Sequence, residues 1–421
     1  MSTRIVAVDH FAGTGWSVAC RWLGIREYGV EIMPDAIRSR RAAGFRTIYR
    51  DVWSGLLHAW LVPLHDMYIA SPPCQTFSIA GAGSGRKALE QVLALIASRT
   101  WQRPAELRAT GAELGDDRTA LVLTPLAHIW AHRPRLVALE QVPTVLPVWE
   151  AMADVLRGIG YSVWTGNLQA EMYGVPQTRK RAILMARLDG PVSPPAPTHS
   201  RYYSRDPQRL DPGVEKWVSM ADALGHGGFD LVGNQVPRGA ARGDYHKRPS
   251  DVPAQTFTGA ARSWALRSNY SSGRLGGIAP EGSKLPRTER ELAEPSSTLT
   301  SKAGSMLWIR RGLEGRPSPT ITGGGVETGG AEPIAKIERY MSSPDWVGEK
   351  RRLYLHEAAA LQSYPPGFPF QGSRGKQFLQ VGNAVPPLLA QAILRSLAAA
   401  PISSIDDTSA DMLVELEEVM V

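Results

Sequence analysis

Short apolar runs alternate with amphipathic stretches along the first 188 residues of the chain. Apolar residues that recur every three or four positions predict helices, whereas compact apolar runs bounded by turn residues predict buried strands. Because strands that alternate with helices are typical of βαβ units, we expect an α/β fold around a mostly parallel sheet. The expected strands span residues 5–8, 27–31, 47–49, 67–70, 136–139, 162–168 and 182–186. The expected helices span residues 16–23, 34–43, 88–99, 121–131 and 148–158.

The pattern changes at Pro191, where proline, glycine and serine become frequent and the run from Pro194 to Pro197 marks a boundary. From there to residue 344 the sequence has little helical periodicity. Three loose repeats each place a proline before a Thr-apolar-Thr run, which is typical of a turn that leads into a half-buried strand. The repeats lie at residues 253–258, 295–300 and 317–322. We therefore expect a small, loop-rich β domain.

Helical patterning returns near Arg352, with helices expected at residues 355–361 and 384–400. Pro386 and Pro387 lie in the first turn of the second helix, a position that tolerates proline. Because the α/β character resumes, we interpret the β segment as an insertion. The expected division is one α/β domain at residues 1–190 and 345–400, the insertion at residues 191–344, and an acidic tail at residues 401–421.

The net charge of +7 is distributed unevenly along the chain. Residues 191–344 contain 20 Lys or Arg and 15 Asp or Glu, whereas residues 401–421 contain six acids and no base. A positive surplus on one segment suits a polyanionic partner such as nucleic acid. A solvated surface with five extra charges is also common, so the charge alone leaves both interpretations open.

The composition, with 43% apolar and 21% charged residues, is that of a soluble globular chain. No apolar run approaches the roughly 18 residues of a membrane span, and the first residues lead directly into a strand, so we expect a cytoplasmic protein without a membrane partner. The two cysteines, Cys20 and Cys74, provide no disulfide framework. Neither the cysteines nor the histidines have the spacing of a metal site, so we expect no metal.

Cys74 follows the expected strand at residues 67–70, within the sequence Ser71-Pro72-Pro73-Cys74-Gln75. The two prolines fix φ, and Pro73 also disfavours a helical conformation for the residue before it. The thiol is therefore expected on a stiff loop at the carboxyl edge of the sheet, where open α/β folds bind ligands. This position suits a nucleophile. A small buried apolar residue is the alternative for Cys74 considered alone.

Residues 9–15 connect the first expected strand to the first expected helix. Gly13 and Gly15 allow the backbone to approach a ligand closely at a helix N-terminus. Glu31 ends the second expected strand and Asp51 follows the third, positions from which carboxylates in such sheets reach ribose hydroxyls and an adenine amino group. Either acid could equally be an exposed surface residue.

Five short motifs follow one another along the chain: Phe11-Ala-Gly-x-Gly, Pro73-Cys74-Gln75, Glu140-Gln141-Val142, Gln177-Thr178-Arg179-Lys180-Arg181 and Gly382-Asn383-Ala384-Val385-Pro386. This order resembles that of the DNA cytosine-5 methyltransferases, and the residues around Arg352, Glu357 and Tyr364 are also similar to that family. The resemblance covers about residues 4–188 and 350–396. It implies a Rossmann-like, S-adenosylmethionine-dependent methyltransferase domain, with the insertion in the place of the target recognition domain.

The resemblance also implies a role for each motif. Cytosine C5 is a poor nucleophile towards a methyl sulfonium, so a thiolate must first add at C6, and Cys74 is the candidate. Nearby positive charge is expected to favour the thiolate of Cys74. Glu140 is expected to protonate or hydrogen-bond N3 of the base, while Arg179 and Arg181 hold the base carbonyl and the acidic group. Two arginines at a strand edge would otherwise be solvated.

S-adenosylmethionine is the implied cofactor. Its expected binding residues are Phe11, Gly13, Gly15, Glu31, Asp51, Pro73, Asn383 and Val385. In the family, the asparagine at the position of Asn383 also braces the Pro-Cys loop.

Double-stranded DNA is the implied partner, and the target base must leave the stack before it can react. The insertion is expected to read a specific sequence in the major groove through its basic residues. The candidate DNA contacts are Gln75, Arg238, Arg242, Lys247, Arg248, Arg262, Arg267 and Arg274. We expect a monomer, with a cognate restriction endonuclease as a separately acting partner.

Two alternatives have the same catalytic residues or the same partner. An RNA (tRNA) cytosine-5 methyltransferase is the nearest, but the tRNA-modifying members that resemble this family carry a shorter insertion. A catalytically inactive DNA-binding regulator is the other, and the presence of Cys74, Glu140 and both arginines argues against it.

The chain departs from the family pattern at several positions. Gln141 replaces the usual asparagine, so we expect the contact that braces the Pro-Cys loop to be repositioned. His10 and Trp16 replace the more usual leucine and glycine. The segment between Gln75 and Asp117 is longer than the family's mobile loop, and the helix expected at residues 88–99 could cover the flipped base, contact DNA or be an inert insertion.

Overall fold

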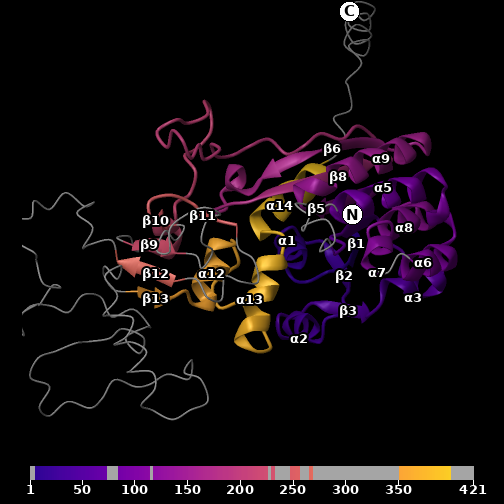
Figure 1. Cartoon of the computed structure of the whole chain (residues 1–421), viewed down its shortest axis with the longest axis horizontal. Helices are drawn as coiled ribbons and strands as arrows, with labels where there is room; N and C mark the ends of the chain where they lie inside the picture. The colour runs from indigo at the N-terminus through magenta and orange to yellow at the C-terminus, as the bar shows by residue number, and fades with distance from the viewer. Residues whose placement is uncertain are drawn as a thin grey trace, which may run out of the picture.

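A seven-stranded sheet forms the centre of the computed structural model, which describes residues 5–73, 84–113, 117–225, 229–232, 247–256, 265–268 and 350–399 (Figure 1). The strand order is β3-β2-β1-β4-β5-β8-β6. Pairs from β3 to β5 are parallel, and β8 runs antiparallel to both β5 and β6. The strands are β1 (Val6–His10), β2 (Arg26–Val30), β3 (Arg46–Tyr49), β4 (Met67–Ala70), β5 (Leu136–Gln141), β6 (Ser162–Gln169) and β8 (Lys180–Arg187). The expected mostly parallel sheet is confirmed, because all seven expected strands are present with their ends within two residues.

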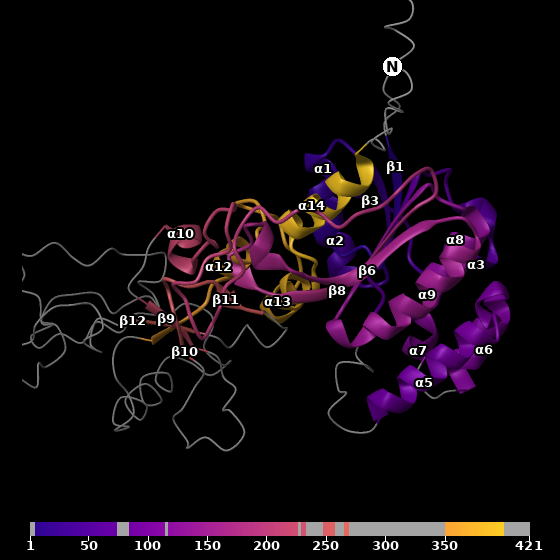
Figure 2. The same cartoon turned by 90° about the horizontal axis from the view of Figure 1, so that it is seen from above.

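Every residue of the central strands β4 and β5 is buried, since helices cover both faces of the sheet. Alternate side chains of a strand point to opposite faces. Tyr68 and Val137 therefore pack in one core, while Met67 and Ala138 pack in the other. The first core is covered by α3 (Val52–Leu57), α5 (Ser84–Ala97), α8 (Thr124–His132) and α9 (Leu146–Gly158), and the second by α1 (Gly15–Trp22) and α14 (Pro387–Ala398) (Figure 2).

The long segment after Gln75 contains α5, α6 (Pro104–Glu113) and α7 (Asp117–Leu121). Ala88, Val92 and Ile96 of α5 are buried in the first core, so the apolar side of the expected helix is part of the fold. The segment therefore extends the α/β domain. No helix in the described part of the chain is long and apolar enough to cross a membrane.

The C-terminal helices return to the sheet, as the sequence predicted. Helix α12 (Leu355–Leu361) has the expected bounds, and α14 packs against α1. The expected helix at residues 384–400 begins later, at Pro387, because residues 384–386 are extended and the preceding residues belong to α13 (Arg374–Asn383). Helix α13 was not predicted; its apolar contacts to the core come mainly from Phe378 and Val381. The short helix α2 (Pro34–Ala42) contacts both β3 and α13.

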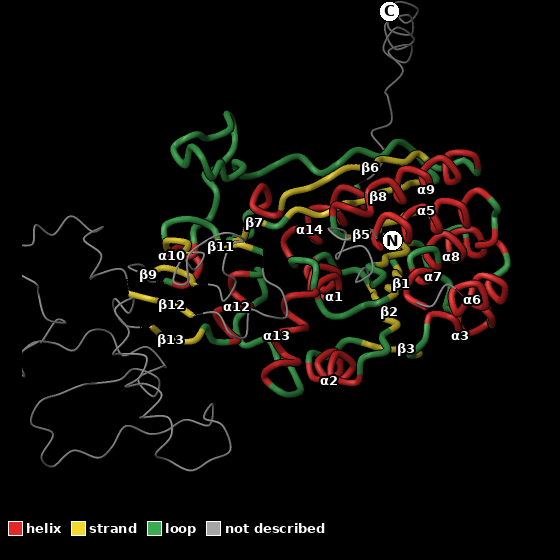
Figure 3. The backbone as a smooth tube through the Cα atoms, viewed as in Figure 1, coloured by secondary structure: helices red, strands yellow, loops and turns green. Residues whose placement is uncertain are grey.

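A second, smaller sheet lies beside α12 and α13, at the end of a long loop that leads from β8 to α10 (Met220–Leu224) (Figure 3). It has the antiparallel order β10-β9-β12-β13. Its strands are β9 (Phe229–Val232), β10 (Lys247–Pro249), β12 (Ala265–Ser268) and β13 (Lys350–Arg352). The segment expected to be a small β domain, residues 191–344, thus contains strands. Strand β13 belongs to the same sheet but lies after residue 344.

The first of the three proline repeats connects the second sheet to the α/β domain. Strand β11 (Ala254–Gln255) pairs in parallel with β7 (Gln177–Thr178). The hydroxyl of Thr256 donates to the carbonyl oxygen of Thr178 at 2.7 Å. The repeats at residues 295–300 and 317–322 lie outside the described residues.

Four histidines, which we call the histidine cluster (His10, His65, His128 and His132), lie together in the first core. His10 and His128 are fully buried, and Tyr68 stacks on His128 while its hydroxyl lies 2.9 Å from Nδ1 of His10. Nε2 of His128 lies 3.0 Å from Nε2 of His65. Among the described residues, no three His, Cys, Asp or Glu side chains are arranged to hold a metal ion. Burial, followed by the proximity of His65 and His132, lowers the pKa of His10 to about 3.

We predict that His10→Leu makes the protein less sensitive to acid. Because the pKa of His10 is lower in the folded state than its usual 6.5, the unfolded chain binds the proton more tightly. The neutral, buried His10 therefore stabilises the fold fully above pH 6.5, and this stabilisation is lost as the pH falls towards 3. Relative to wild type, the variant should gain about 2 kcal/mol in unfolding free energy between pH 8 and pH 5. Urea unfolding at the two pH values measures this gain. A difference between the proteins that is independent of pH would contradict the assignment, and His58→Leu, at an exposed position, is the control.

Candidate active site

The carboxyl ends of β1, β4 and β5 lie side by side and form the edge at which the sequence motifs meet. His10 pairs with Ala70, and Ala70 pairs with Leu139. The glycine loop, residues 11–15, therefore begins beside residues 71–73, which in turn lie beside Glu140. The strand that leads to Cys74 and the strand that carries Glu140 are therefore neighbours. Cys74 and Gln75 themselves lie outside the described residues.

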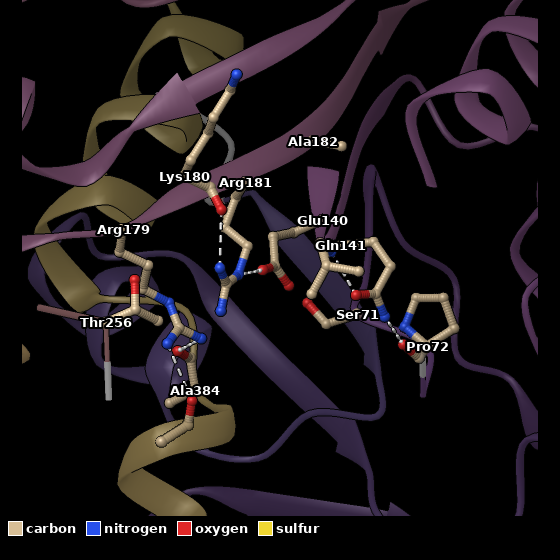
Figure 4. A network of polar contacts seen from close by, with 12 residues as sticks. Ser71, Pro72, Glu140, Gln141, Arg179, Lys180, Arg181, Ala182, Thr256 and Ala384 are labelled. Carbon is tan, nitrogen blue, oxygen red and sulfur yellow. Dashed lines mark hydrogen bonds and ion pairs between the residues drawn. The ribbon is translucent and has the colours of Figure 1, made fainter. Parts of the chain in front are cut away.

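Glu140 is buried at the end of β5 and forms an ion pair with Arg181. Its Oε1 lies 2.8 Å from Nε of Arg181, and the two side chains are only 6% and 11% exposed (Figure 4). The antiparallel register explains this pair: Glu140 is opposite Ile183, so Arg181, two residues along β8, is its diagonal neighbour on the same face. Nη1 of Arg181 also donates to the carbonyl oxygen of Lys180 at 2.8 Å. The carboxylate therefore has one orientation fixed by a charged partner.

Arg179 takes a different direction from Arg181, because it lies between β7 and β8 (Figure 4). Its Nη1 donates to the carbonyl oxygen of Gly382 and its Nη2 to that of Ala384, each at 3.0 Å. Arg179 is 2% exposed, and its two hydrogen bonds connect the end of α13 to the α/β sheet. In the structure Arg181 thus holds the acidic group, whereas Arg179 holds main-chain carbonyl groups at the end of α13.

The Pro-Cys loop is held by Gln141, the residue that replaces the family's asparagine. Its Nε2 donates to the carbonyl oxygen of Pro72, while its Oε1 accepts the main-chain N–H of Val142. The longer side chain thus still reaches the loop. The side chain of Asn383, expected to brace the same loop, is exposed at the end of α13.

The glycine loop is shaped by Glu31 and by its own backbone. Oε2 of Glu31 accepts the N–H of Gly13 at 2.9 Å, and Oε1 accepts the N–H of Met33 at 2.8 Å. Gly13 has φ of +45°, and a Cβ there would enter space with no atom within 4 Å. A Cβ on Gly15 would come within 2.1 Å of the Val385 carbonyl oxygen. The open space in front of Gly13, next to a buried acid, fits a ligand with hydroxyl groups.

Phe11 and Asp51 complete the set of expected pocket residues. Phe11 is partly buried and has a φ of +59°. Because of this left-handed conformation, the backbone turns sharply from β1 into the glycine loop. Asp51 caps α3, because its Oδ1 accepts the N–H of Trp53 at 3.1 Å. Its other carboxylate oxygen is not needed for this cap.

Arg40 holds the glycine loop through a hydrogen bond to Gly13. The sequence did not predict this role. It is fully buried, and Nη1 donates to the carbonyl oxygen of Gly13 at 3.1 Å while Nη2 pairs with Oε1 of Glu27 at 2.7 Å. Burial and the negative charge of Glu27 raise the pKa of the neighbouring Asp9 well above its usual range. The position of Arg40 in a helix, between exposed arginines, does not indicate that it is buried. The residue that reflects its burial is Gly29, where a Cβ would come within 2.0 Å of the Arg40 guanidinium.

The expected DNA contacts are only partly described. Lys247 and Arg248 lie on β10, and Arg267 lies on β12. Strand β13, next to β12, consists of Lys350, Arg351 and Arg352, which were not among the expected DNA contacts. Arg238, Arg242, Arg262 and Arg274 lie outside the described residues.

A family model and two sequence relatives agree on one family. The family model described as C-5 cytosine-specific DNA methylase matches residues 110–222 and 294–399, just over half of the chain. The type II methyltransferase M.Bpa9945I of Bacillus paralicheniformis is 42% identical over 350 residues, which are 79% of this chain and 70% of that protein. The type II methyltransferase M.AplI of Arthrospira platensis is 25% identical over 404 residues, covering 94% and 86%. A solved structure of the S. pombe Dnmt2 methyltransferase aligns with a TM-score of 0.48 and 14% identity, covering 94% of this chain and 98% of that one.

We predict that Arg179→Met destabilises the fold by about 3 kcal/mol, because two buried carbonyl groups lose a charged donor. Methionine retains much of the apolar length of the side chain, so the lost hydrogen bonds dominate the change. The midpoint of urea unfolding measures the effect. Arg157→Met is the control: its ion pair with Asp154 is 51% and 80% exposed, and it should cost less than about 0.5 kcal/mol. Equal losses in the two variants would contradict the role of Arg179.

Proposed function

Because the chain belongs to the family of C-5 cytosine-specific DNA methylases, it is a DNA (cytosine-5-)-methyltransferase, and we propose that it methylates cytosine within one specific double-stranded sequence through a covalent adduct of Cys74. The observation that carries this proposal is the position of the Glu140–Arg181 pair. It lies at the end of β5, beside the strand that leads into residues 71–74. A nucleophile and an acid on neighbouring strand ends can act on two atoms of one ring.

The proposed reaction uses each group on a different atom of the base. The Cys74 thiolate forms a bond to C6, which moves electron density towards C5 and N3. Glu140 donates a proton or a hydrogen bond at N3, and Arg181 keeps the carboxyl group directed there. When bound, S-adenosylmethionine supplies an electrophilic methyl group for C5. Loss of the C5 proton to a base then allows the S–C6 bond to break and restores the aromatic ring.

We propose that the space in front of the glycine loop holds S-adenosylmethionine. A carboxylate has about four acceptor sites, so Glu31 can accept ribose hydroxyls in addition to its two N–H donors. Ile32 follows it with 64% of its surface exposed and offers an apolar face to the adenine ring. The second carboxylate oxygen of Asp51, which accepts no hydrogen bond from the described residues, can bind the adenine amino group, and Phe11 and Gly15 border the loop. Pro73, Asn383 and Val385 are proposed to complete the pocket.

The second sheet is proposed to contact DNA. Strands β10, β12 and β13 contain six basic residues, and together they suit a phosphate backbone. Basic residues on this sheet can also read guanine edges in the major groove. Gln75 and the arginines outside the described residues remain candidates for the same role. Flipping of the target base costs a few kcal/mol, which such contacts offset.

The two alternatives make different demands. A tRNA-modifying enzyme would need the same acid and nucleophile but no major-groove reader, and the long insertion at residues 191–344 favours DNA. An inactive regulator would not need the buried Glu140–Arg181 pair, which is intact. We propose that the enzyme acts as a monomer in the cytoplasm of a bacterial or phage-infected cell. The proposed partner is a cognate endonuclease that acts separately.

Cys74→Ser is predicted to abolish methyl transfer and leave DNA binding nearly unchanged, since an alcohol is far less nucleophilic but similar in size. DNA that contains 5-fluorocytosine at the target should form a stable covalent adduct with the wild type, because fluorine at C5 cannot leave as a proton does. Mass spectrometry locates the attached residue. An adduct on Cys20, the buried cysteine of α1, would overturn the assignment.

Glu140→Gln is predicted to lower kcat by at least a hundredfold while the affinity for S-adenosylmethionine changes less than about threefold, because the amide keeps the shape and loses the acidic proton. Glu31→Ala should show the reverse order, with weaker cofactor binding as the first effect. Calorimetry with S-adenosylhomocysteine separates the two. Comparable loss of affinity in both variants would make Glu140 a pocket residue and not the acid.

A further inference from the structure

Trp16 connects the helix after the glycine loop to the segment that leads to Cys74. It is the second residue of α1 and is 1% exposed. Its indole Nε1 donates to Oγ of Ser71 at 2.9 Å. Ser71 directly follows β4, and its main-chain N–H donates to the carbonyl oxygen of His10 at 3.3 Å. The first residue of the Pro-Cys loop is thus joined to both the end of β1 and the start of α1.

The position of the Trp16 ring is itself determined by packing. The ring belongs to the second core, between residues of the sheet and α14. Gly15, the residue before it, lies so close to Val385 that no side chain fits there. Because the ring is fixed by packing, its N–H can reach few other acceptors. Buried indole N–H groups normally have a hydrogen-bond partner. Ser71 is that partner.

A second contact holds the next residue of the loop from another element. Gln141, at the end of β5, donates to the carbonyl oxygen of Pro72. Consecutive residues are therefore attached to α1 and to β5, and the prolines at positions 72 and 73 restrict the φ angles that follow. The chain reaches Cys74 from a segment with few remaining degrees of freedom.

We propose that Trp16 is a positioning residue, which couples the cofactor-binding glycine loop to the nucleophile loop (residues 71–74). The family pattern has glycine at this position, which has no donor for Ser71, so the contact is a property of this chain. The proposal rests on the proposed function, in which Cys74 attacks the base. Its consequence is that the hydrogen bond between Trp16 and Ser71 helps to fix the start of the nucleophile loop relative to the glycine loop.

Four variants test the coupling. Trp16→Phe removes the donor and keeps most of the ring, and Ser71→Ala removes the acceptor. Each should slow formation of the adduct with 5-fluorocytosine DNA by about tenfold, with KM for S-adenosylmethionine within about twofold of wild type. The double variant should be no slower than either single variant, because both remove the same bond. Ser71→Thr retains the hydroxyl and should restore most of the rate.

Trp101→Phe is the matched control. Trp101 is also 1% exposed, and its Nε1 donates to the carbonyl oxygen of Ile96 at 3.1 Å, away from the strand ends that carry the site. This variant should lower the midpoint of urea unfolding as Trp16→Phe does, with an unchanged adduct rate. If Trp16→Phe and Ser71→Ala also left the rate unchanged, or if their effects multiplied in the double variant, the proposal would be wrong.

Hydrogen exchange separates this proposal from the proposed function, because it requires neither DNA nor cofactor. The amide of Ser71, which donates to the carbonyl oxygen of His10, should exchange about tenfold faster in Trp16→Phe and in Ser71→Ala than in wild type or Trp101→Phe. Unchanged exchange would overturn the proposal even in an active enzyme. A wild type that forms no adduct with any DNA would instead contradict the proposed function, and exchange would still decide whether Trp16 holds the loop.

Discussion

The parallel pairing of β1, β4 and β5 is the constraint on which the site depends. Parallel strands all end at the same edge, so loops that are far apart in the sequence begin beside one another. The pairs of His10 with Ala70 and of Ala70 with Leu139 place the glycine loop, residues 71–73 and Glu140 in one row. A shift of the register by one residue would turn Glu140 to the other face of β5 and remove it from Arg181.

Buried arginines hold the segments around this row. Arg40 supports Gly13, Arg181 orients Glu140, and Arg179 binds the carbonyl groups at the end of α13. A guanidinium donates up to five hydrogen bonds in a fixed plane, so one residue can connect two or three segments. The arrangement also explains why the domain is completed by helices from the C-terminal part of the chain. Arg179 joins the turn between α13 and α14 to the residue that separates β7 from β8.

The sequence was most informative where structure is encoded locally. Runs such as residues 67–70 and 136–139 are apolar throughout, which predicted buried strands. Contacts between polar side chains distant in sequence could not be predicted. Trp16 and Ser71 are 55 positions apart, and the periodicity of α2 gave no reason to bury Arg40. Helix α13 was missed because its apolar face is narrow.

Bisulfite sequencing of plasmid DNA from cells that express the protein tests the central claim most directly. The account predicts protected cytosines within one short sequence for the wild type and complete conversion for Cys74→Ser. Complete conversion of the DNA in both cases, with 5-methylcytosine found in tRNA instead, would contradict it.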